Sequence, residues 1–340
     1  MIVLALCSIQ VTSRGPCSTL KGCWSIDAMG IRDLHQVLSS LERNCSVEVF
    51  KNLRVGIDGH GWLYRSAART FKSYNDGLPQ SVDGLQQPPS KDIIQAALDF
   101  FVAEIQKILY HADKVVLVFD GERMPIKNNK KYSNKNRTRV KVTKYMNKML
   151  SLHLEREFLG QKRFEILHAP FEADAQLGYL YRNKFIDVAI SEDYDLLCYG
   201  CLHIVSKYAR GGDGVLIDGR YLYACDWKPN VDFSSWTESM FLTFCILCGC
   251  DFLDRLQSVG PVKAYDAVQT YDDNIEAILI NWTETGAVKN IPLSYLFDFT
   301  RSRLTFLHAV VVNENNELVH LTKVPDKDLK LVGNYLGKIA

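Results

Sequence analysis

The chain has 340 residues, 47% of them hydrophobic, so it can bury one large core or two ordinary ones. Its formal net charge of +1 provides no overall attraction for a nucleic acid. A nucleic-acid partner would therefore have to be held by a local basic patch. Because no apolar run reaches the roughly 18 residues of a membrane span, we expect no membrane partner.

Residues 1–28 differ in composition from the rest of the chain. They hold several serines, two basic residues and a single acid, Asp27. A targeting presequence would place a charged segment ahead of the apolar run, and that segment is missing here. We therefore expect an extension that is disordered or not in the mature protein, followed by a single domain over residues 29–340.

Short apolar runs alternate with helix-like segments along much of this domain. Such alternation predicts an α/β fold with a mostly parallel central sheet flanked by helices. A loop rich in Gly and Pro is expected over residues 76–92, a helical pattern follows Asp251, and a further strand is expected over residues 308–314. The main expected strands are residues 53–57, 114–119, 164–167, 187–190 and 203–206, and the clearest helices are residues 92–110 and 172–183.

Two of the cysteine spacings invite comparison with zinc sites. Cys198 and Cys201 form one CxxC pair, and Cys245 and Cys248 form another. Paired CxxC knuckles hold zinc when they lie on turns. The second pair lies in an apolar, helix-like run, so we favour reduced, buried thiols over a zinc site.

Acidic residues follow four of the predicted strands. The carboxyl ends of parallel strands meet at one edge of a sheet, so these acids are expected to converge in space, with a later Asp joining them. One Asp after a strand is commonly a turn former or a helix cap, but four consecutive strand ends are hard to explain in that way. Carboxylates that lie close together need cations to neutralise their charge. Because carboxylate oxygens are hard ligands, they select Mg²⁺ or Mn²⁺. The acids are Asp58, Asp120, Glu172, Asp174, Asp193, Asp195 and Asp251.

A basic segment begins three residues after Asp120. Between Arg123 and Lys148 the chain holds ten Lys or Arg residues and no acid. Isolated charge runs are usually solvated faces or disordered arms. The position beside the acids instead favours a strap over the pocket, which would hold a phosphodiester backbone for cleavage by metal-activated water.

The motifs that contain these residues resemble, as a set, the structure-specific 5′ nucleases, the flap endonuclease and exonuclease I group. The resemblance covers almost the whole chain from Met29 onwards, and APFEADAQ and FTRSRLTFLHAVV are most similar to eukaryotic exonuclease I. The motifs are MGIRDL (29–34), IDGHGWLYR (57–65), LVFDGERMPIK (117–127), APFEADAQLGYL (169–180), ISEDYDLLCYG (190–200), ILCGCDFLDRLQSVGPVKA (246–264), FTRSRLTFLHAVV (299–311) and GNYLGK (333–338).

The resemblance implies a PIN-like 5′ nuclease core with two additions, a basic helical arch and a helix–two-turn–helix DNA-binding element. It also places Gly30 close to the active site, where an uncleaved extension would obstruct DNA. The implied regions are an N-terminal nuclease region (29–120), the basic arch (121–160), an internal nuclease region (161–250), the helix–two-turn–helix element (251–275) and C-terminal return helices with a strand (276–340).

The resemblance implies a catalytic site with two Mg²⁺ ions, for which Mn²⁺ can substitute. One ion would be held, directly or through water, by Asp58, Asp120, Glu172 and Asp174, and the other by Asp193, Asp195 and Asp251. Lys127, on the basic helix, would reach the scissile phosphate and complete the catalytic set. Glu192 does not match a ligand position and is expected to face solvent.

The resemblance also implies residues that bind DNA. Tyr64 would stack on a nucleotide, a contact worth roughly 1–3 kcal/mol per base, although a half-buried core tyrosine is an equal alternative. The hairpin would bind the duplex backbone, with K⁺ at the same place. The other implied DNA contacts are Lys127, Lys130, Lys131, Lys135 and Arg137 in the arch, and Ser258, Gly260 and Lys263 in the hairpin.

The sequence departs from the family pattern in three places. Ser258 stands where the first hairpin glycine is expected, which bears on the K⁺ site. Asn134 replaces a second basic residue of the arch, for which Lys131 or Lys135 would have to substitute. The stretch between Asp120 and Glu172 is shorter than usual, so the arch is expected to be reduced.

The implied function is hydrolysis of DNA phosphodiesters, with 5′→3′ exonuclease action on duplex DNA first and 5′ flap endonuclease activity second, in DNA repair or recombination. The DNA partner would be a duplex with nicks, gaps, 5′ ends or flaps. We expect a nuclear monomer, and the extension leaves a mitochondrial location open. A non-catalytic DNA-structure binder would be expected to lose some of the acids. An aspartyl-phosphate phosphatase would need Asp-x-Asp where the chain has IDGH and FDGE.

Overall fold

The computed structural model describes residues 31, 34–63, 91–127, 144–208, 211–224, 232–332 and 336 of the chain. The N-terminal extension and nearly all of the expected loop over residues 76–92 lie outside these ranges.

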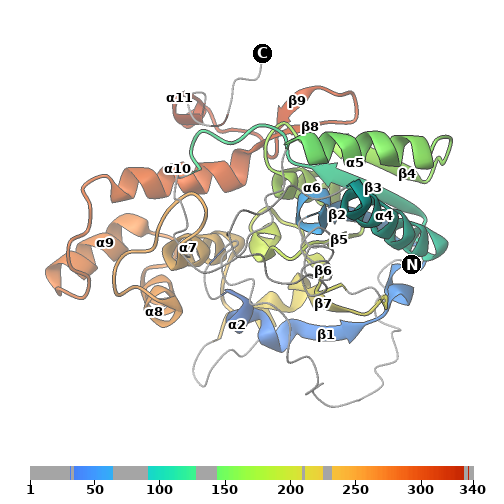
Figure 1. Cartoon of the computed structure of the whole chain (residues 1–340). Helices are drawn as coiled ribbons and strands as arrows, with labels where there is room; N and C mark the ends of the chain where they lie inside the picture. The colour runs from blue at the N-terminus through green and yellow to red at the C-terminus, as the bar shows by residue number, and fades with distance from the viewer. Residues whose placement is uncertain are drawn as a thin grey trace, which may run out of the picture.

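A seven-stranded sheet forms the centre of the protein (Figure 1). The strand order is β1-β7-β6-β5-β2-β3-β4, in which β4, β3, β2, β5 and β6 run parallel and β7 is antiparallel to both β6 and β1. The mostly parallel sheet predicted from the sequence is therefore confirmed. The strands are β1 (Glu42–Cys45), β2 (Arg54–Asp58), β3 (Lys114–Phe119), β4 (Phe164–His168), β5 (Val188–Ile190), β6 (His203–Ser206) and β7 (Gly214–Asp218).

Helices cover both faces of the sheet, because the central strands are apolar on both sides. On β3, Val115 and Leu117 pack in one core cluster with α4 and α5, whereas Val116 and Val118 pack in the other, which contains α6 and α7. The long strand-to-strand connections therefore run as helices across the faces. The helices are α4 (Lys91–His111), α5 (Lys144–Glu157), α6 (Ala173–Arg182) and α7 (Glu238–Cys248).

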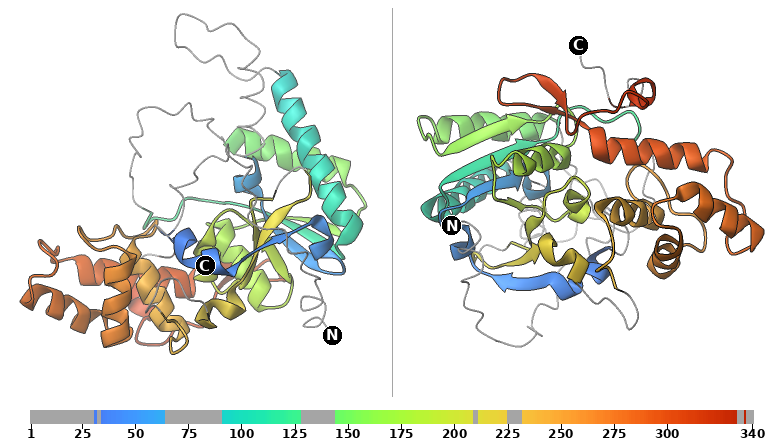
Figure 2. Two further views of the ribbon diagram at one scale, coloured as in Figure 1. Left: turned by 90° about the horizontal axis from the view of Figure 1, so that it is seen from below. Right: turned by 180° about the vertical axis from the view of Figure 1, so that it is seen from behind.

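A group of helices extends to one side of the sheet (Figure 2). It starts from α7, which packs against both α8 and α10, while α9 packs on α8 and α11 on α10. The remaining elements are α2 (Leu34–Leu38), α8 (Pro261–Tyr271), α9 (Ile275–Glu284), α10 (Tyr295–His308), α11 (Leu329–Val332), the hairpin strands β8 (Val310–Val312) and β9 (Leu318–His320), and the 3-10 turns η1 (Ser39–Leu41), η2 (Val47–Phe50), η3 (Tyr194–Leu197) and η4 (Gly219–Ala224). None of the described helices is long and apolar enough to cross a bilayer.

The hairpin of β8 and β9 is attached to α6 by one buried side chain. The Gln176 amide donates to the Val312 carbonyl at 2.8 Å and accepts from the Val312 N–H at 2.8 Å. Gln176 is fully buried, so this pair of hydrogen bonds satisfies both ends of its amide. Residues more than 130 positions apart thereby fix the position of the helix that carries Asp174.

The two DNA-binding additions implied by the resemblance are described only in part. The second half of the basic segment contains α5, but residues 128–143, which would form the top of an arch, lie outside the described ranges. Residues 251–260 form bends and turns and contain no helix, and α8 begins directly after them at Pro261. The structure thus has turns followed by a helix over residues 251–271.

Candidate active site

The acids that follow the parallel strands lie along one edge of the sheet. Asp58 ends β2 and Asp120 directly follows β3. Glu172 is the residue before α6 and Asp174 lies in the first turn of that helix. The other three follow β5 and α7, where Asp193 caps η3, Asp195 lies within η3, and Asp251 follows α7. The predicted convergence of these acids is therefore confirmed, while their role as metal ligands stays a prediction.

Backbone N–H groups hold several of the carboxylates in place. Asp120 Oδ1 accepts from the Ala173 N–H at 2.8 Å, and Asp58 Oδ1 accepts from the Gly61 N–H at 3.0 Å. Asp195 Oδ1 accepts from the Ile31 N–H at 2.6 Å, which places the start of the described chain beside the acids, as expected. These contacts fix the side-chain rotamers without neutralising the charges.

The environment of the acids makes their ionised forms costly. Burial is the main cause that raises the pKa of six of them, and repulsion among neighbouring carboxylates adds to it. The effect is strongest for Asp174 and Asp195, whose pKa values lie well above the usual range. Oδ1 of Asp174 is also buried without a hydrogen-bond partner among the described residues. The six acids are Asp58, Asp120, Glu172, Asp174, Asp193 and Asp195.

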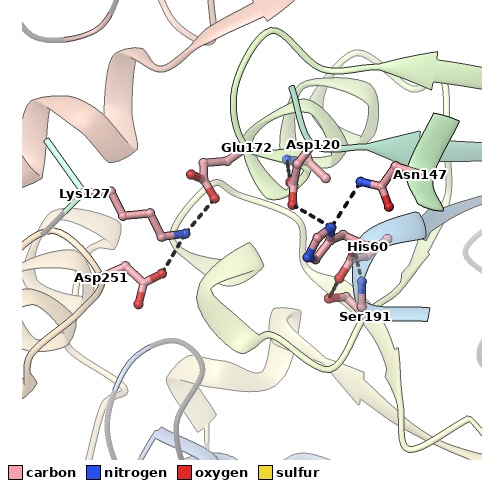
Figure 3. Close-up of polar contacts among 10 residues, drawn as sticks. His60, Asp120, Lys127, Asn147, Glu172, Ser191 and Asp251 are labelled. Atoms are coloured by element: carbon pink, nitrogen blue, oxygen red, sulfur yellow. Dashed lines mark hydrogen bonds and ion pairs between the residues drawn. The ribbon is translucent and has the colours of Figure 1, made fainter. Parts of the chain in front are cut away.

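Lys127 supplies a positive charge inside this group (Figure 3). Its Nζ lies 2.9 Å from Glu172 Oε2 and 2.9 Å from Asp251 Oδ2. Burial lowers the pKa of Lys127, but attraction to these two acids outweighs burial and raises the pKa overall. The sequence predicts that Lys127 reaches the scissile phosphate, and that role stays a prediction. The expectation that it lies on a helix is wrong, because residues 125–127 form a turn closed by the Lys127 N–H and the Met124 carbonyl at 3.1 Å.

The donor set fits hard divalent cations. Every acid in it offers carboxylate oxygens, and burial and mutual repulsion, which raise the pKa of Asp58, Asp174 and Asp193, oppose ionisation of these groups together without added positive charge. In the described part of the chain, no three His, Cys, Asp or Glu side chains are already arranged as a complete ligand group. The Lys127 ammonium lies between Glu172 and Asp251, so binding of an ion there would require this lysine to move.

Three side chains near the acids were not predicted as site residues. Ser191 Oγ donates to Asp58 Oδ2 at 3.3 Å, and His60 Nδ1 lies 3.7 Å from Asp120 Oδ2. Asn147, on α5, points its Nδ2 at His60 Nδ1 over 3.4 Å. His60 could have been found from the sequence, since it follows Asp58 by two residues at a strand end. Nothing in the sequence indicated Asn147.

The predicted DNA-binding residues are placed only in part. Ser258 has a positive φ of 70°, in the left-handed region that a glycine adopts more easily. Gly260 caps α8, and a Cβ there would meet no atom within 4 Å. Lys263 Nζ donates to the Ala287 carbonyl at 2.9 Å. Glu192 is half-buried and accepts from the Lys207 N–H at 3.0 Å. Tyr64, Lys130, Lys131, Lys135 and Arg137 lie outside the described residues.

Gly121 sets the path of the chain next to Asp120, and its replacement gives a first testable prediction. Its N–H donates to the Phe171 carbonyl at 2.7 Å, and a Cβ would lie 2.0 Å from the Ala169 carbonyl oxygen. Gly121→Ala is therefore expected to lower the free energy of unfolding by about 1–3 kcal/mol in urea titrations. Gly211→Ala is the control, because its Cβ would meet its nearest atom at 3.5 Å. Equal stability of the two variants would contradict this account.

The fold and its acid-rich edge define a class of protein, an α/β domain with a candidate divalent-cation site at the carboxyl ends of its parallel strands. Residues 29–142 match the XPG N-terminal domain, and residues 163–251 match the XPG I-region. Together the two matches cover more than half of the chain, which therefore belongs to the XPG family of structure-specific 5′ nucleases.

Known relatives agree with this assignment. Exonuclease 1 of Oryza sativa subsp. japonica is 27% identical over 333 residues, which cover 91% of this chain and 37% of that protein. The chain thus spans well under half the length of this relative. The catalytic core of Rad2 in complex with a DNA substrate aligns with a TM-score of 0.60 at 19% identity, covering 91% of this chain and 95% of that one. GEN1 in complex with product DNA and a Mg²⁺ ion aligns with a TM-score of 0.55 at 19% identity, covering 84% and 66%.

Proposed function

We propose that the chain is a Mg²⁺-dependent nuclease that hydrolyses DNA phosphodiesters, acting 5′→3′ on duplex DNA and also cutting 5′ flaps. The observation that carries the proposal is the group of seven acids beside one half-buried lysine at the carboxyl edge of the sheet. Family membership supports phosphodiester hydrolysis, and the similarity to exonuclease 1 favours exonuclease action over flap cutting. Flap endonuclease action alone remains the second candidate.

The acids would divide into two ligand groups on either side of the edge. Asp58, Asp120, Glu172 and Asp174 would hold one ion, and Asp193, Asp195 and Asp251 the other. The bound ions would activate water and neutralise charge on the phosphate. Because the acids have raised pKa values, metal binding would release protons, and affinity would rise with pH over the range in which these acids titrate.

Lys127 would change partners during the reaction. Its ammonium is held by Glu172 and Asp251, at 2.9 Å from each. When ions bind the acids, this ammonium would be released toward the scissile phosphate and would stabilise the negative charge that develops there. The half-buried position matters, because a charge that is partly shielded from water acts more strongly than a fully exposed one.

The turn before α8 and the basic segment would bind the DNA. The open space around Gly260 would let a phosphodiester backbone approach, and K⁺ would bind carbonyl groups of the turn at Ser258. The basic segment would hold the strand near the acids, with Tyr64 stacked on a base. We further propose that the protein acts as a monomer on nicks, gaps, 5′ ends and flaps in the nucleus, or in mitochondria if the extension directs it there.

A cleavage assay tests the proposal. Protein starting at Gly30 is incubated in Mg²⁺ with 5′-labelled DNA, either a recessed-end duplex or a 5′ flap, beside Asp193→Asn. This variant removes one charge and keeps an oxygen to accept the Asp195 N–H, which Asp193 Oδ1 accepts at 2.9 Å. Short nucleotides released from the duplex by the native protein only would support exonuclease action. Cutting at the flap base alone would favour the flap endonuclease. DNA binding without any Mg²⁺-dependent cleavage would overturn the enzyme proposal in favour of a binding protein.

A further inference from the structure

His60 lies at the edge of the acid group. It belongs to a helical turn over residues 59–63 that directly follows β2 and Asp58. Its Nδ1 lies 3.7 Å from Asp120 Oδ2 and 3.4 Å from Asn147 Nδ2, as Figure 3 shows. The His60 side chain is 35% exposed, so solvent and ions can reach it. A histidine of this kind is not explained as part of the apolar core.

Asp120 has one oxygen directed at this imidazole. Its Oδ1 accepts from the Ala173 N–H at 2.8 Å, which fixes the carboxylate plane. Its Oδ2 faces His60 Nδ1 and is 3.7 Å away. Two ligand atoms that share one ion at about 2.0–2.2 Å each lie roughly 3–4 Å apart, so this separation suits a shared cation.

Asn147 brings a third donor from a different element. It projects from α5, and its Oδ1 is buried without a hydrogen-bond partner among the described residues. The oxygen and nitrogen of an amide exchange places when the group rotates by half a turn, so Oδ1 can take the position now held by Nδ2. An amide oxygen is a ligand for hard cations, and a neighbouring carboxylate strengthens such a site.

We propose that His60 is a nitrogen ligand of the cation held by Asp120, with Asn147 as an oxygen ligand at the same position. The inference rests on the proposed function, since it adds a donor to that metal site. Imidazole binds Mg²⁺ weakly and favours first-row transition metals. A site with this nitrogen therefore prefers Mn²⁺ or Co²⁺ over Mg²⁺ more strongly than one made of carboxylates alone.

Mn²⁺ serves as the probe, because its electron spin reports directly bound nitrogen without any reaction. The Gly30-start protein is titrated with Mn²⁺, and the bound ion is examined by pulsed electron spin-echo spectroscopy. We expect modulation from a coordinated ¹⁴N nucleus in the native protein and in His111→Gln, the control at the end of α4. His60→Gln should lack this modulation and bind Mn²⁺ about tenfold more weakly, a loss typical of damage to a metal site. Its affinity for Mg²⁺ should change by no more than about twofold.

A labelled sample guards against misfolding of the variant. Native protein grown with ¹⁵N-histidine should show ¹⁵N in place of the ¹⁴N signal, which identifies the donor as histidine without any substitution. Mn²⁺ bound with no nitrogen modulation would overturn the ligand assignment and leave the proposed nuclease site intact. Failure to bind Mn²⁺, in a protein that also fails to cleave, would instead overturn both proposals.

Discussion

Asp174→Asn is expected to abolish Mg²⁺-dependent cleavage and at the same time to stabilise the metal-free protein. Burial, with repulsion from Asp193 and Asp58, raises the pKa of Asp174 well above its usual range. Oδ1 of Asp174 is buried without a hydrogen-bond partner among the described residues, and a charge at such an atom opposes folding, so the Asp174→Asn substitution should raise the melting temperature in EDTA. Loss of one ligand should slow cleavage by about 10³-fold or more, equivalent to roughly 4 kcal/mol.

Asp187→Asn is the matched control for this result. Asp187 is paired with Arg54 through contacts of 2.7 and 2.9 Å at the opposite edge of the sheet, and hydrogen bonds from Arg54 lower its pKa against the opposing effect of burial. The Asp187→Asn substitution should therefore destabilise the protein by about 1.5–3 kcal/mol and leave the cleavage rate unchanged. Thermal unfolding in EDTA and single-turnover cleavage measure both effects. If Asp174→Asn were active, or destabilised like the control, the assigned role of Asp174 would be wrong.

The raised pKa values also predict how stability varies with pH. An acid whose pKa is higher in the folded state contributes full stability below its unfolded pKa of about 4, and this contribution is lost as pH rises toward the folded value. The six acids all shift in this direction. Urea unfolding in EDTA should therefore show lower stability at pH 8 than at pH 5. Added Mg²⁺ should weaken this dependence of stability on pH. A free energy of unfolding that does not change with pH in EDTA would contradict the prediction.

Lys127→Ala is expected to slow cleavage and yet to tighten metal binding. Without the ammonium, the scissile phosphate loses a preorganised charge, which should lower kcat by about 10²–10³-fold with little change in KM. Glu172 and Asp251 would lose the cation that now contacts both at 2.9 Å, so Mn²⁺ should bind them more tightly. Lys127→Arg should fall between the two proteins in rate.

Lys323→Ala provides a control, because this lysine is exposed and remote in sequence from the acids. It should cleave DNA at the native rate and bind Mn²⁺ with native affinity. A Lys127→Ala protein with native kcat would exclude the proposed contact with the phosphate. A fall in Mn²⁺ affinity in that variant would show that the lysine supports the metal ligands and does not compete with bound ions.

The sequence predicted the central strands because they are continuous apolar runs. β3 and β6 begin and end at the expected residues, since both are apolar runs buried within the sheet. β1 was missed because an edge strand of the sequence ERNC carries no apolar pattern, and its place depends on pairing with β7. The pairing of an edge strand depends on the rest of the fold, so the sequence of that strand alone does not indicate it.

The site was predicted to the extent that chain topology determines it. Acids at the ends of parallel strands must meet at one edge, so their convergence followed from their positions in the sequence. The approach of Asn147 could not be predicted in this way, because it depends on how α5 packs. Leu150 and Leu154 fix that helix in the core, and only this packing turns Asn147 toward His60.

The Gln176–Val312 contact has a consequence for the order in which the protein is made. Asp174 leaves the ribosome long before Val312, so α6 lacks its buried hydrogen-bond partner during most of synthesis. A ribosome-bound chain that stops short of residue 310 is therefore expected to leave α6 open to proteases. The helix that carries Asp174 therefore gains its last buried hydrogen bonds only after Val312 has emerged, so the acid group is expected to be assembled late in synthesis.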